Sequence, residues 1–400
     1  MKLLIGGSPC THWSIAQTKN RETEASGIGW ELFLNYRIAR DKYQPDYFLY
    51  ENNKSMSAAI REQITAELGV EPVLINSALV SAQNRQRLYW VGKRNPDGTY
   101  SQVPVEQPED RGILLRDILE SGAVTWHEKA YTLRASAATK QGVSNVLRHI
   151  ETNGHFGYMG VAEPVRIGTM CGQGGGLGAK TGLYAVPVPE PVNETVDGKA
   201  QCLRATYYKD GIRNMVGNTV DRKTCVAMPV ETAAEPRSIL VVTAPGKSIP
   251  VYEVRNGRIT IKGKEYPIKL ADGFYIIRKL TVTECKRLQT VPDAYVFPVS
   301  DTQAYKMLGN GWTVDVIAHI MSHFTGLTEE AVEVLSMYDG MSCGHIALDK
   351  LGVQPWLLRY YATEIDKYAI QTTQHNFPDT VQLGDAFQVR DDGWRLGEEL

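Results

Sequence analysis

The chain has 400 residues, of which 43% are hydrophobic, so it can bury a large core and we expect two domains. It contains no run near the ~18 consecutive apolar residues that a membrane-spanning helix needs, and its first residues lack the apolar core of a secretory signal. Its six cysteines are scattered without a Cys-x-x-Cys pair, which predicts neither a disulfide framework nor a zinc site. We therefore expect a cytoplasmic protein with no membrane partner and no bound metal.

The net charge of −2 hides a gradient along the chain. Residues 121–270 contain 19 Lys and Arg against 12 Asp and Glu, a balance of +7, and the other residues together carry −9. A basic middle between acidic flanks suits a module that docks on phosphates. A solvated surface of uneven charge explains the same count.

The first stretch with chemical character follows a short apolar strand, Lys2–Ile5. Glycines and a proline then lead to Cys10, which places a thiol at the carboxyl edge of a sheet, where α/β enzymes hold their reactive groups. A small buried cysteine is the alternative for any lone thiol. Residues 11–29 are polar and irregular, which predicts a mobile lid beside the thiol.

A second strand and a pair of arginines point to the same edge. An amphipathic helix over 30–38 precedes the strand Tyr47–Tyr50, which delivers Glu51 to the edge that holds Cys10. A helix over 58–68 and strands over 72–75 and 88–91 follow. On extended backbone the guanidinium groups of Arg85 and Arg87 share one face. A thiol, a carboxylate and two arginines together suit an anionic substrate.

Residues 96–270 lose the alternation of strands and helices, and short β-rich segments appear at 239–243 and 258–262. The segments 129–136 and 199–206 resemble each other, and each places an arginine, Arg134 and Arg204, on the expected basic face. Two copies do not make a solenoid. The glycine run over 172–178 lacks the Gly-Lys-Ser/Thr of a phosphate loop and is interpreted as a flexible loop.

Regular structure returns after residue 276. Thr281 and Glu284 form a capping box that opens a helix through Leu288, and an apolar helix follows over 316–324. The last seventy residues predict a strand over 332–338, a glycine turn, a helix over 345–351 and a strand over 357–363. Glu364 follows that strand and Asp385 follows a third. Glycines that let a ligand approach the backbone, with an acidic group for ribose hydroxyls, are typical of nucleotide-type cofactor sites.

These segments together resemble the DNA cytosine-5 methyltransferase family over nearly the whole chain. Six segments carry the resemblance: Gly6–Cys10 to the nucleophile motif, Glu51–Asn53 to Glu-Asn-Val, Gln83–Arg87 to Gln-x-Arg-x-Arg, 278–292 to the motif after the recognition domain, Gly309–Asn310 to the Gly-Asn motif, and Tyr338–Gly344 to Phe-x-Gly-x-Gly. Asn53 replaces the family's valine. Tyr338 replaces its phenylalanine, and the second glycine of that turn comes late.

The resemblance implies an α/β fold of the S-adenosylmethionine-dependent, Rossmann-like type, with a mostly parallel sheet and an inserted β-rich recognition domain. We expect catalytic segments over 1–120 and 276–400 and a target-recognition domain over 121–275. In the family the cofactor motifs precede the cysteine, whereas here they come last, so the chain resembles a circular permutation. That predicts neighbouring termini at Met1 and Leu400. A domain-swapped dimer, in which the C-terminal half completes a second copy, is the alternative to a monomer.

The resemblance also implies a mechanism. Cys10 as thiolate attacks C6 of a cytosine that has been flipped out of duplex DNA, and residues 11–29 close over it. Glu51 acts at the ring's N3, Arg87 binds O2, and Arg85 binds a phosphate or Glu51. C5 then takes the methyl group of S-adenosylmethionine, which leaves as S-adenosylhomocysteine.

By the same resemblance the cofactor contacts are Tyr338, Asp339, Gly340, Gly344, Glu364, Ile365, Asp385, Asn310 and Trp312. Candidate DNA contacts are Ser14, Arg134, Arg204, Lys209 and Arg213. Trp312 is equally well explained as a core residue.

Three other functions fit part of the pattern. An RNA cytosine methyltransferase shares the site but does not need so long a middle. A non-catalytic DNA-binding homologue requires that the two halves fail to assemble, which an intact Cys10, Glu51 and Arg87 argues against. A nicotinamide-dependent enzyme explains Glu364 but gives no role to the segment before Cys10. A restriction endonuclease partner is compatible with the sequence.

Overall fold

The computed structural model describes residues 1–9, 12–13, 21–120, 122–123, 159–160, 190–192, 200, 225–229, 240–244, 247–268, 270–278 and 280–391. The chain forms two compact units. The sheet unit comprises Met1–Leu114, Cys202–Lys209 and Cys285–Leu400, and the middle unit comprises Leu115–Gln201 and Asp210–Glu284. No helix among the described residues has the length and hydropathy to cross a bilayer.

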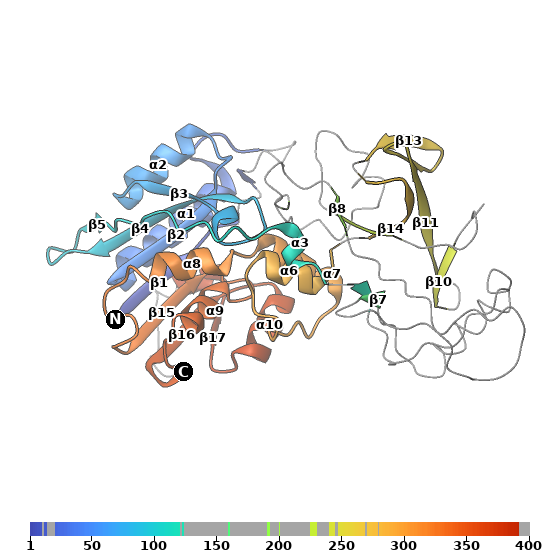
Figure 1. The fold of residues 1–400 in the computed structure, drawn as a ribbon. Helices are drawn as coiled ribbons and strands as arrows, with labels where there is room; N and C mark the ends of the chain where they lie inside the picture. Colours follow the sequence, from blue (N-terminus) through green and yellow to red (C-terminus); the bar gives the residue numbers. More distant parts are fainter. Residues whose placement is uncertain are drawn as a thin grey trace, which may run out of the picture. The chain divides into compact units, whose positions relative to one another are not determined.

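The sheet unit is built on one mixed sheet (Figure 1). Its described strands are β1 (Lys2–Gly6), β2 (Tyr47–Asn53), β3 (Pro72–Asn76), β4 (Gln86–Arg94), β5 (Tyr100–Gln102), β15 (Val332–Met337), β16 (Leu358–Thr363) and β17 (Val381–Gly384). Their order is β17-β16-β15-β1-β2-β4-β3, with β5 beside β4. The strands from β17 to β2 run parallel, whereas β4 is antiparallel to β2, β3 and β5. The expected mostly parallel α/β sheet is confirmed.

This strand order brings distant parts of the sequence to one edge. β1 pairs with β2 on one side, with Leu3 opposite Tyr47, and with β15 on the other, with Leu3 opposite Val334. Because the carboxyl ends of parallel neighbours lie together, the turn after β1, the end of β2 and the glycine turn after β15 meet at that edge.

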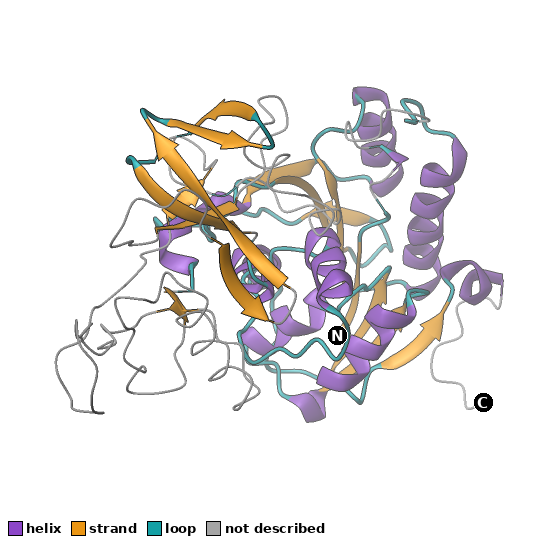
Figure 2. Ribbon diagram, turned by 90° about the vertical axis from the view of Figure 1, so that its right-hand side faces the viewer, coloured by secondary structure: helices purple, strands orange, loops and turns teal. Residues whose placement is uncertain are grey.

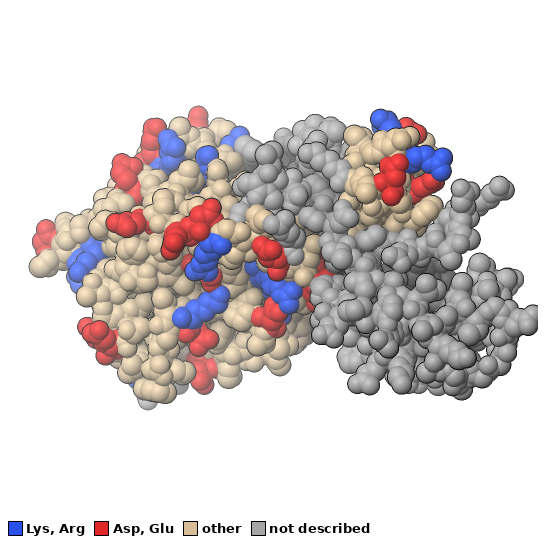
Figure 3. Space-filling view, in the orientation of Figure 1, with Lys and Arg blue, Asp and Glu red and all other residues tan. Residues whose placement is uncertain are grey.

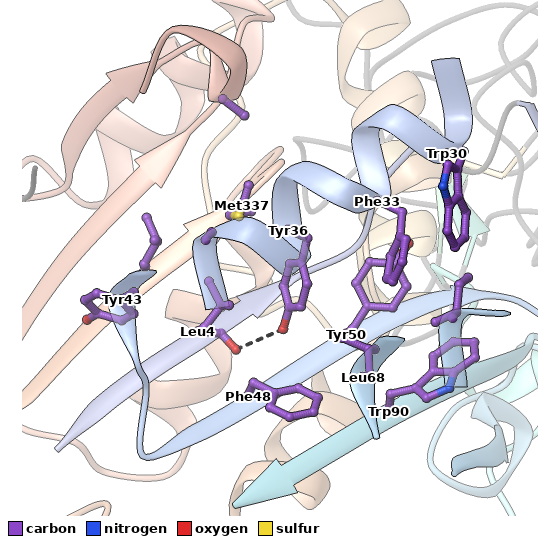
Figure 4. Packing of buried hydrophobic residues seen from close by; sticks show 14 of the residues in the cluster. Leu4, Trp30, Phe33, Tyr36, Tyr43, Phe48, Tyr50, Leu68, Trp90 and Met337 are labelled. Atoms are coloured by element: carbon purple, nitrogen blue, oxygen red, sulfur yellow. Dashed lines mark hydrogen bonds between the residues drawn. The ribbon is translucent and has the colours of Figure 1, made fainter. Parts of the chain in front are cut away.

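Helices cover both faces of the sheet (Figure 2). The helices α1 (Gly27–Tyr43), α2 (Ala58–Leu68) and α11 (Ala386–Asp391) contribute to one core with the sheet side chains Leu4, Phe48, Tyr50 and Met337. Figure 4 shows this core, in which Tyr36 of α1 donates hydrogen bonds to the carbonyls of Leu4 (3.3 Å) and Leu49 (2.8 Å). On the other face, α9 (Cys343–Lys350) approaches Ile5 and Tyr360, and α8 (Val314–Met321) packs on α9.

Several expected elements differ from the structure in their bounds. Glu51 and the two asparagines after it belong to β2, because they pair with Tyr89, Leu88 and Arg87 of β4. The first helix begins at Gly27, so residues 27–29 are not part of the expected lid. A further helix, α7, spans Asp301–Asn310, where no element was predicted.

The middle unit is β-rich, as expected from the sequence. Its main described sheet has the order β13-β12-β11-β14-β9-β8, with β10 beside β11. The bounds are β8 (Glu190–Val192), β9 (Cys225–Pro229), β10 (Leu240–Ala244), β11 (Lys247–Arg255), β12 (Arg258–Ile261), β13 (Lys264–Pro267) and β14 (Gly273–Arg278), and the unit also holds α3 (Leu115–Ile118), β6 (Gly122–Ala123) and β7 (Met159–Gly160). The chain leaves it through α6 (Val282–Leu288), whose capping box is confirmed: Thr281 N–H donates to Glu284 Oε2 (2.7 Å) and Glu284 N–H to Thr281 Oγ1 (3.1 Å).

The remaining helix of the sheet unit, α10 (Lys367–Asn376), starts at an N-cap formed by Asp366, whose side chain accepts a hydrogen bond from Tyr368 N–H. Lys306 of α7 also binds the Asp366 carboxylate, at 2.7 Å. The cap thus joins α7 to α10.

We predict that Gly92→Ala destabilises the protein through a single contact. Gly92 lies opposite Phe48, and a Cβ at position 92 would lie 2.2 Å from a carbon of that buried ring. Since overpacking a core forces side chains or backbone to move, the free energy of unfolding should fall by about 1–3 kcal/mol in urea titrations. In a Phe48→Leu background, where the ring is absent, the same substitution should cost less. Equal costs in the two backgrounds would contradict the contact.

Candidate active site

The turn after β1 is fixed to β2 by a buried polar cluster. Ser8 Oγ and the Tyr50 hydroxyl share a hydrogen bond of 2.6 Å, and the Asn52 amide donates to the Ser8 carbonyl (3.2 Å) and to the Tyr50 hydroxyl (3.2 Å). Asn52 is therefore a structural partner of the turn that leads to the expected nucleophile. The chain is described up to Pro9, and Cys10 lies outside the described residues.

Glu51 is the best-defined group of the site. Its Oε1 lies 3.0 Å from Arg87 Nε, and its Oε2 accepts a hydrogen bond of 3.0 Å from Trp312 Nε1. The two charged side chains are only 11% and 16% exposed, so their ion pair is largely shielded from water. A Cβ on Gly7 would lie 2.9 Å from Glu51 Oε2, so only glycine allows this close approach. The site thus presents a carboxylate with a donor on each oxygen.

Arg85 plays a different part from Arg87. Its buried guanidinium donates to the carbonyls of Gly309 (3.3 Å) and Gly311 (2.8 Å), at the turn between α7 and α8. The two arginines thus have different protein partners, and the expected contact of Arg85 with a substrate phosphate stays a prediction. Arg87 pairs with the Glu51 carboxylate, and Arg85 braces the turn that carries Trp312.

A chain of buried hydroxyl and amide groups fixes the same turn. Thr313 Oγ1 lies 2.8 Å from Ser77 Oγ and donates to Gln289 Oε1 at 2.9 Å, while the Gln289 amide donates to the Leu308 carbonyl at 2.6 Å. Gln83 also donates to Gln289 Oε1, at 3.2 Å. Satisfied buried networks of this kind specify one conformation.

The glycine turn after β15 is organised by Asp339. Its carboxylate accepts hydrogen bonds from Ser336 (2.6 Å), Tyr360 (2.8 Å) and Ser342. Burial raises its pKa to about 6, and the nearby Glu364 adds to the increase, against these hydrogen bonds. Asp339 therefore holds the turn from inside the fold.

Glu364 and its neighbours line the outer side of this turn. Glu364 Oε2 accepts from Gly340 N–H (2.8 Å), and its Oε1 accepts from the main-chain N–H groups of Ile365 and Asp366 (2.7 Å each). Gly340 has φ +61° with open space where a Cβ would be, and the Ile365 side chain is 75% exposed. Asp385 follows β17 and caps α11 through Phe387 N–H (2.9 Å). An open glycine, a carboxylate and an exposed apolar side chain fit a nucleoside-bearing cofactor.

Other residues expected at the cofactor have different surroundings. A Cβ on Gly344 would lie 2.3 Å from Ile5 Cδ1, so this glycine serves the packing of α9 on β1. Tyr338, at φ +60°, is partly buried and donates to the Leu32 carbonyl at 2.8 Å. Asn310 is exposed at the end of α7. Trp312 contacts the Glu51 carboxylate, a pairing that the sequence did not predict.

The base of the expected lid is anchored. Trp13 is fully buried and its indole donates to Glu22 Oε2 at 3.0 Å, while Arg21 donates to the carbonyls of Trp13 (3.2 Å) and Ser55 (2.6 Å). No pattern in the sequence predicted these contacts. Ser14, Arg134, Arg204, Lys209 and Arg213 lie outside the described residues, so their DNA contacts stay predictions.

Two further reactive side chains near the glycine turn are held neutral. Burial raises the pKa of the Cys343 thiol to about 12 and lowers the pKa of His345 to about 4. Within the described part of the chain, no three His, Cys, Asp or Glu side chains gather as metal ligands would. A buried thiol of this kind is a poor nucleophile.

The fold and the site define an α/β enzyme with an ion-paired carboxylate at the sheet edge that also carries a nucleotide-type turn. The model of the C-5 cytosine-specific DNA methylase family matches residues 1–325, and the chain belongs to that family of DNA methyltransferases. The expected family and class of enzyme are confirmed.

Several characterised proteins are similar to the chain. The orphan methyltransferase M.SPRI of Bacillus phage SPR is 24% identical over 375 residues, which cover 80% of this chain and 81% of that protein. The type II methyltransferase M.HpaII of Haemophilus parainfluenzae is 24% identical over 327 residues, covering 79% and 69%. The solved structure of the Entamoeba histolytica methyltransferase EhMeth is 14% identical, covers 80% of this chain and 76% of its own, and has a TM-score of 0.37.

The raised pKa of Asp339 predicts how stability depends on pH. A carboxyl whose pKa is higher in the folded state binds more protons folded than unfolded, so its contribution is present at low pH and lost as pH rises through about 6. Relative to Asp339→Asn, the wild-type free energy of unfolding should fall between pH about 4 and about 6, by at most about 3 kcal/mol.

Asp366→Asn is the matched control, with the opposite sign. Burial raises the pKa of Asp366, but hydrogen bonds from Lys306 and Tyr368 N–H lower it overall. The wild type should therefore gain stability over this variant as pH rises through the acid range. Urea titrations at a series of pH values measure both differences, and a flat difference for Asp339→Asn would contradict its raised pKa.

Proposed function

We propose that the protein transfers a methyl group from S-adenosylmethionine to C5 of a cytosine flipped out of duplex DNA, through a covalent adduct with Cys10, and releases S-adenosylhomocysteine. The observation that carries the proposal is the Glu51 carboxylate, which is bound by Arg87 and Trp312 and lies against Gly7, three residues before the cysteine. An acid–base group beside a potential nucleophile is the minimum that this chemistry needs.

The chemistry assigns one task to each residue. The Cys10 thiolate forms a bond to C6, and Glu51 at N3 supplies or shares the proton that balances the charge on the ring. C5 becomes nucleophilic, takes the methyl group and loses its proton to a base, after which the bond between sulfur and C6 breaks. Arg87 keeps Glu51 oriented and would donate to the ring's O2 once the base is bound.

The glycine turn after β15 would hold the cofactor, which supplies the methyl group when bound. Gly340 leaves space for close approach, Glu364 accepts hydrogen bonds from ribose hydroxyls, and the exposed Ile365 offers an apolar face to the adenine. Asp385, directly after β17, would accept from the adenine amine. Asp339 and Tyr338 shape the turn, and Asn310 and Trp312 belong to the wall nearest the reaction.

A circular permutation explains how the chain builds this fold. The strands that carry the expected cofactor turn, β15 to β17, come last in sequence, yet β15 pairs directly with β1. They also lie beyond residue 325, where the match to the family model ends. Met1 N lies 2.7 Å from the Ala331 carbonyl, beside the start of β15, whereas Leu400 lies outside the described residues. We propose a monomer, with a domain-swapped dimer as the alternative.

The middle unit would read the DNA. We assign residues 121–275 to target recognition as an inserted domain, because this part carries the positive balance. The face of the protein drawn in Figure 3 has Lys and Arg interspersed with Asp and Glu over its described surface, so that surface is no phosphate-binding patch. Ser14, Arg134, Arg204, Lys209 and Arg213 are the proposed DNA contacts, and residues 11–26 the closing lid. A type II relative such as M.HpaII makes a partner endonuclease a reasonable proposal.

The test is transfer of labelled methyl from S-adenosylmethionine to mixed-sequence duplex DNA, with wild type, Cys10→Ala and Cys285→Ala compared. Cys285 is a buried cysteine of α6 that is in no disulfide, so its removal controls for loss of a thiol. We expect transfer by the wild type and by Cys285→Ala, and a loss of at least about 10³-fold in Cys10→Ala, because the adduct cannot form.

RNA of mixed sequence is the second substrate. Transfer to RNA and not to DNA would replace the proposed substrate. A folded wild type that binds DNA and transfers methyl to neither substrate would identify a non-catalytic homologue. Transfer that survives in Cys10→Ala would exclude the covalent route.

A further inference from the structure

We propose that Trp312 is a positioning residue for Glu51. The reaction depends on the hydrogen bond from its indole N–H to the carboxylate more than on any contact between the indole and the cofactor. The inference rests on the proposed function and adds a residue to it. It starts from the hydrogen bond of 3.0 Å between Trp312 Nε1 and Glu51 Oε2.

The carboxylate of Glu51 is held in one plane by two donors on different oxygens. Arg87 Nε binds Oε1 and the indole binds Oε2, and both distances are 3.0 Å. With Arg87 alone, the terminal torsion of the glutamate would be broad, because rotation about an sp³–sp² bond has shallow preferences. The second donor fixes which way the carboxylate faces, and a general acid must meet its proton partner within hydrogen-bond reach.

An indole suits this task better than another charged group. The Trp N–H is a donor only and carries no charge, so it orients the carboxylate without competing for its proton. It also adds an apolar ring beside a carboxylate that is already largely buried. A Cβ on Gly7 would lie 2.9 Å from Glu51 Oε2 and 3.5 Å from Trp312 Nε1, so this glycine admits both groups.

The position of the indole is determined by the rest of the sheet unit. Arg85 donates to the carbonyls of Gly309 and Gly311, on the N-terminal side of Trp312, and Thr313 on its other side is bound to Ser77 and Gln289. Gly311 itself lies against Cys343, where a Cβ would come within 3.2 Å of the sulfur. Arg85 therefore affects the orientation of Glu51 indirectly, by holding the turn that carries Trp312.

The test compares Trp312→Phe with Trp312→Gln in the methyl-transfer assay. Phenylalanine keeps an aromatic ring and removes the donor, whereas glutamine loses the ring and keeps an N–H of similar reach. Under single-turnover conditions we expect Trp312→Phe to lose roughly 10–100-fold in rate, the size of one lost hydrogen bond to a charged group. The KM for DNA and the equilibrium dissociation constant for S-adenosylmethionine should change less than about twofold. Trp312→Gln should recover at least part of the rate.

Gly7→Ala is a second variant that crowds the same carboxylate and keeps the indole N–H in place as a donor. Its methyl group would lie 2.8 Å from the Glu51 carbonyl oxygen and 2.9 Å from Glu51 Oε2, so we expect a loss of rate at least as large, with unchanged cofactor binding. Thermal melts monitored by circular dichroism confirm that each variant is folded. If Trp312→Phe keeps its rate, or if it instead weakens cofactor binding about tenfold, the inference is wrong. A wild type without transfer activity would contradict the proposed function itself, which keeps the two failures distinct.

Discussion

The carboxylate of Glu51 is where the separate parts of the sheet unit meet. It lies at the end of β2, receives Arg87 from the neighbouring antiparallel strand β4, and receives Trp312 from the turn between α7 and α8. A charged group with so little exposure to water is stable only if both oxygens have donors. The burial of the Glu51 carboxylate therefore depends on three features together: the turn before Cys10, the pairing of β2 with β4, and the turn between α7 and α8.

Short sequence patterns predicted the helices, strands and caps whose formation depends on residues close together in the chain. The α2 helix, the capping box at Thr281 and Glu284, and the strands β1, β15 and β16 follow from hydrophobic period and end signals within about ten residues. The sequence also brought Glu51 and the two arginines to one edge of the sheet, but it offered Arg85 as the partner of Glu51, whereas Arg87 forms the ion pair.

The remaining details depend on contacts between residues far apart in the sequence. The sequence predicted Gly344 only as a cofactor contact, and its close approach to the side chain of Ile5 was not foreseen. Arg85 donates to carbonyls more than 220 residues further along the chain, a contact that the sequence did not predict. No pattern within a window of sequence encodes which distant carbonyl a guanidinium will meet. The donor role of Trp312 was not predicted for the same reason. A tryptophan can pack in a core, line a cofactor site or donate a hydrogen bond, and its residue type does not tell which.

Bringing together site residues that lie far apart in the sequence costs little more conformational entropy than bringing together near ones. Glu51 and Arg87 are 36 residues apart, whereas Glu51 and Trp312 are 261 apart. Because the entropy of loop closure grows only with the logarithm of loop length, the longer closure costs about 2 kcal/mol more than the shorter one. The buried bonds of Arg85, Thr313 and Gln289 can offset that difference, since each satisfied hydrogen bond contributes about 1 kcal/mol. The order in which the segments occur along the chain is therefore a weak constraint on this fold, and the pairing of β1 with β2 and β15 is a strong one.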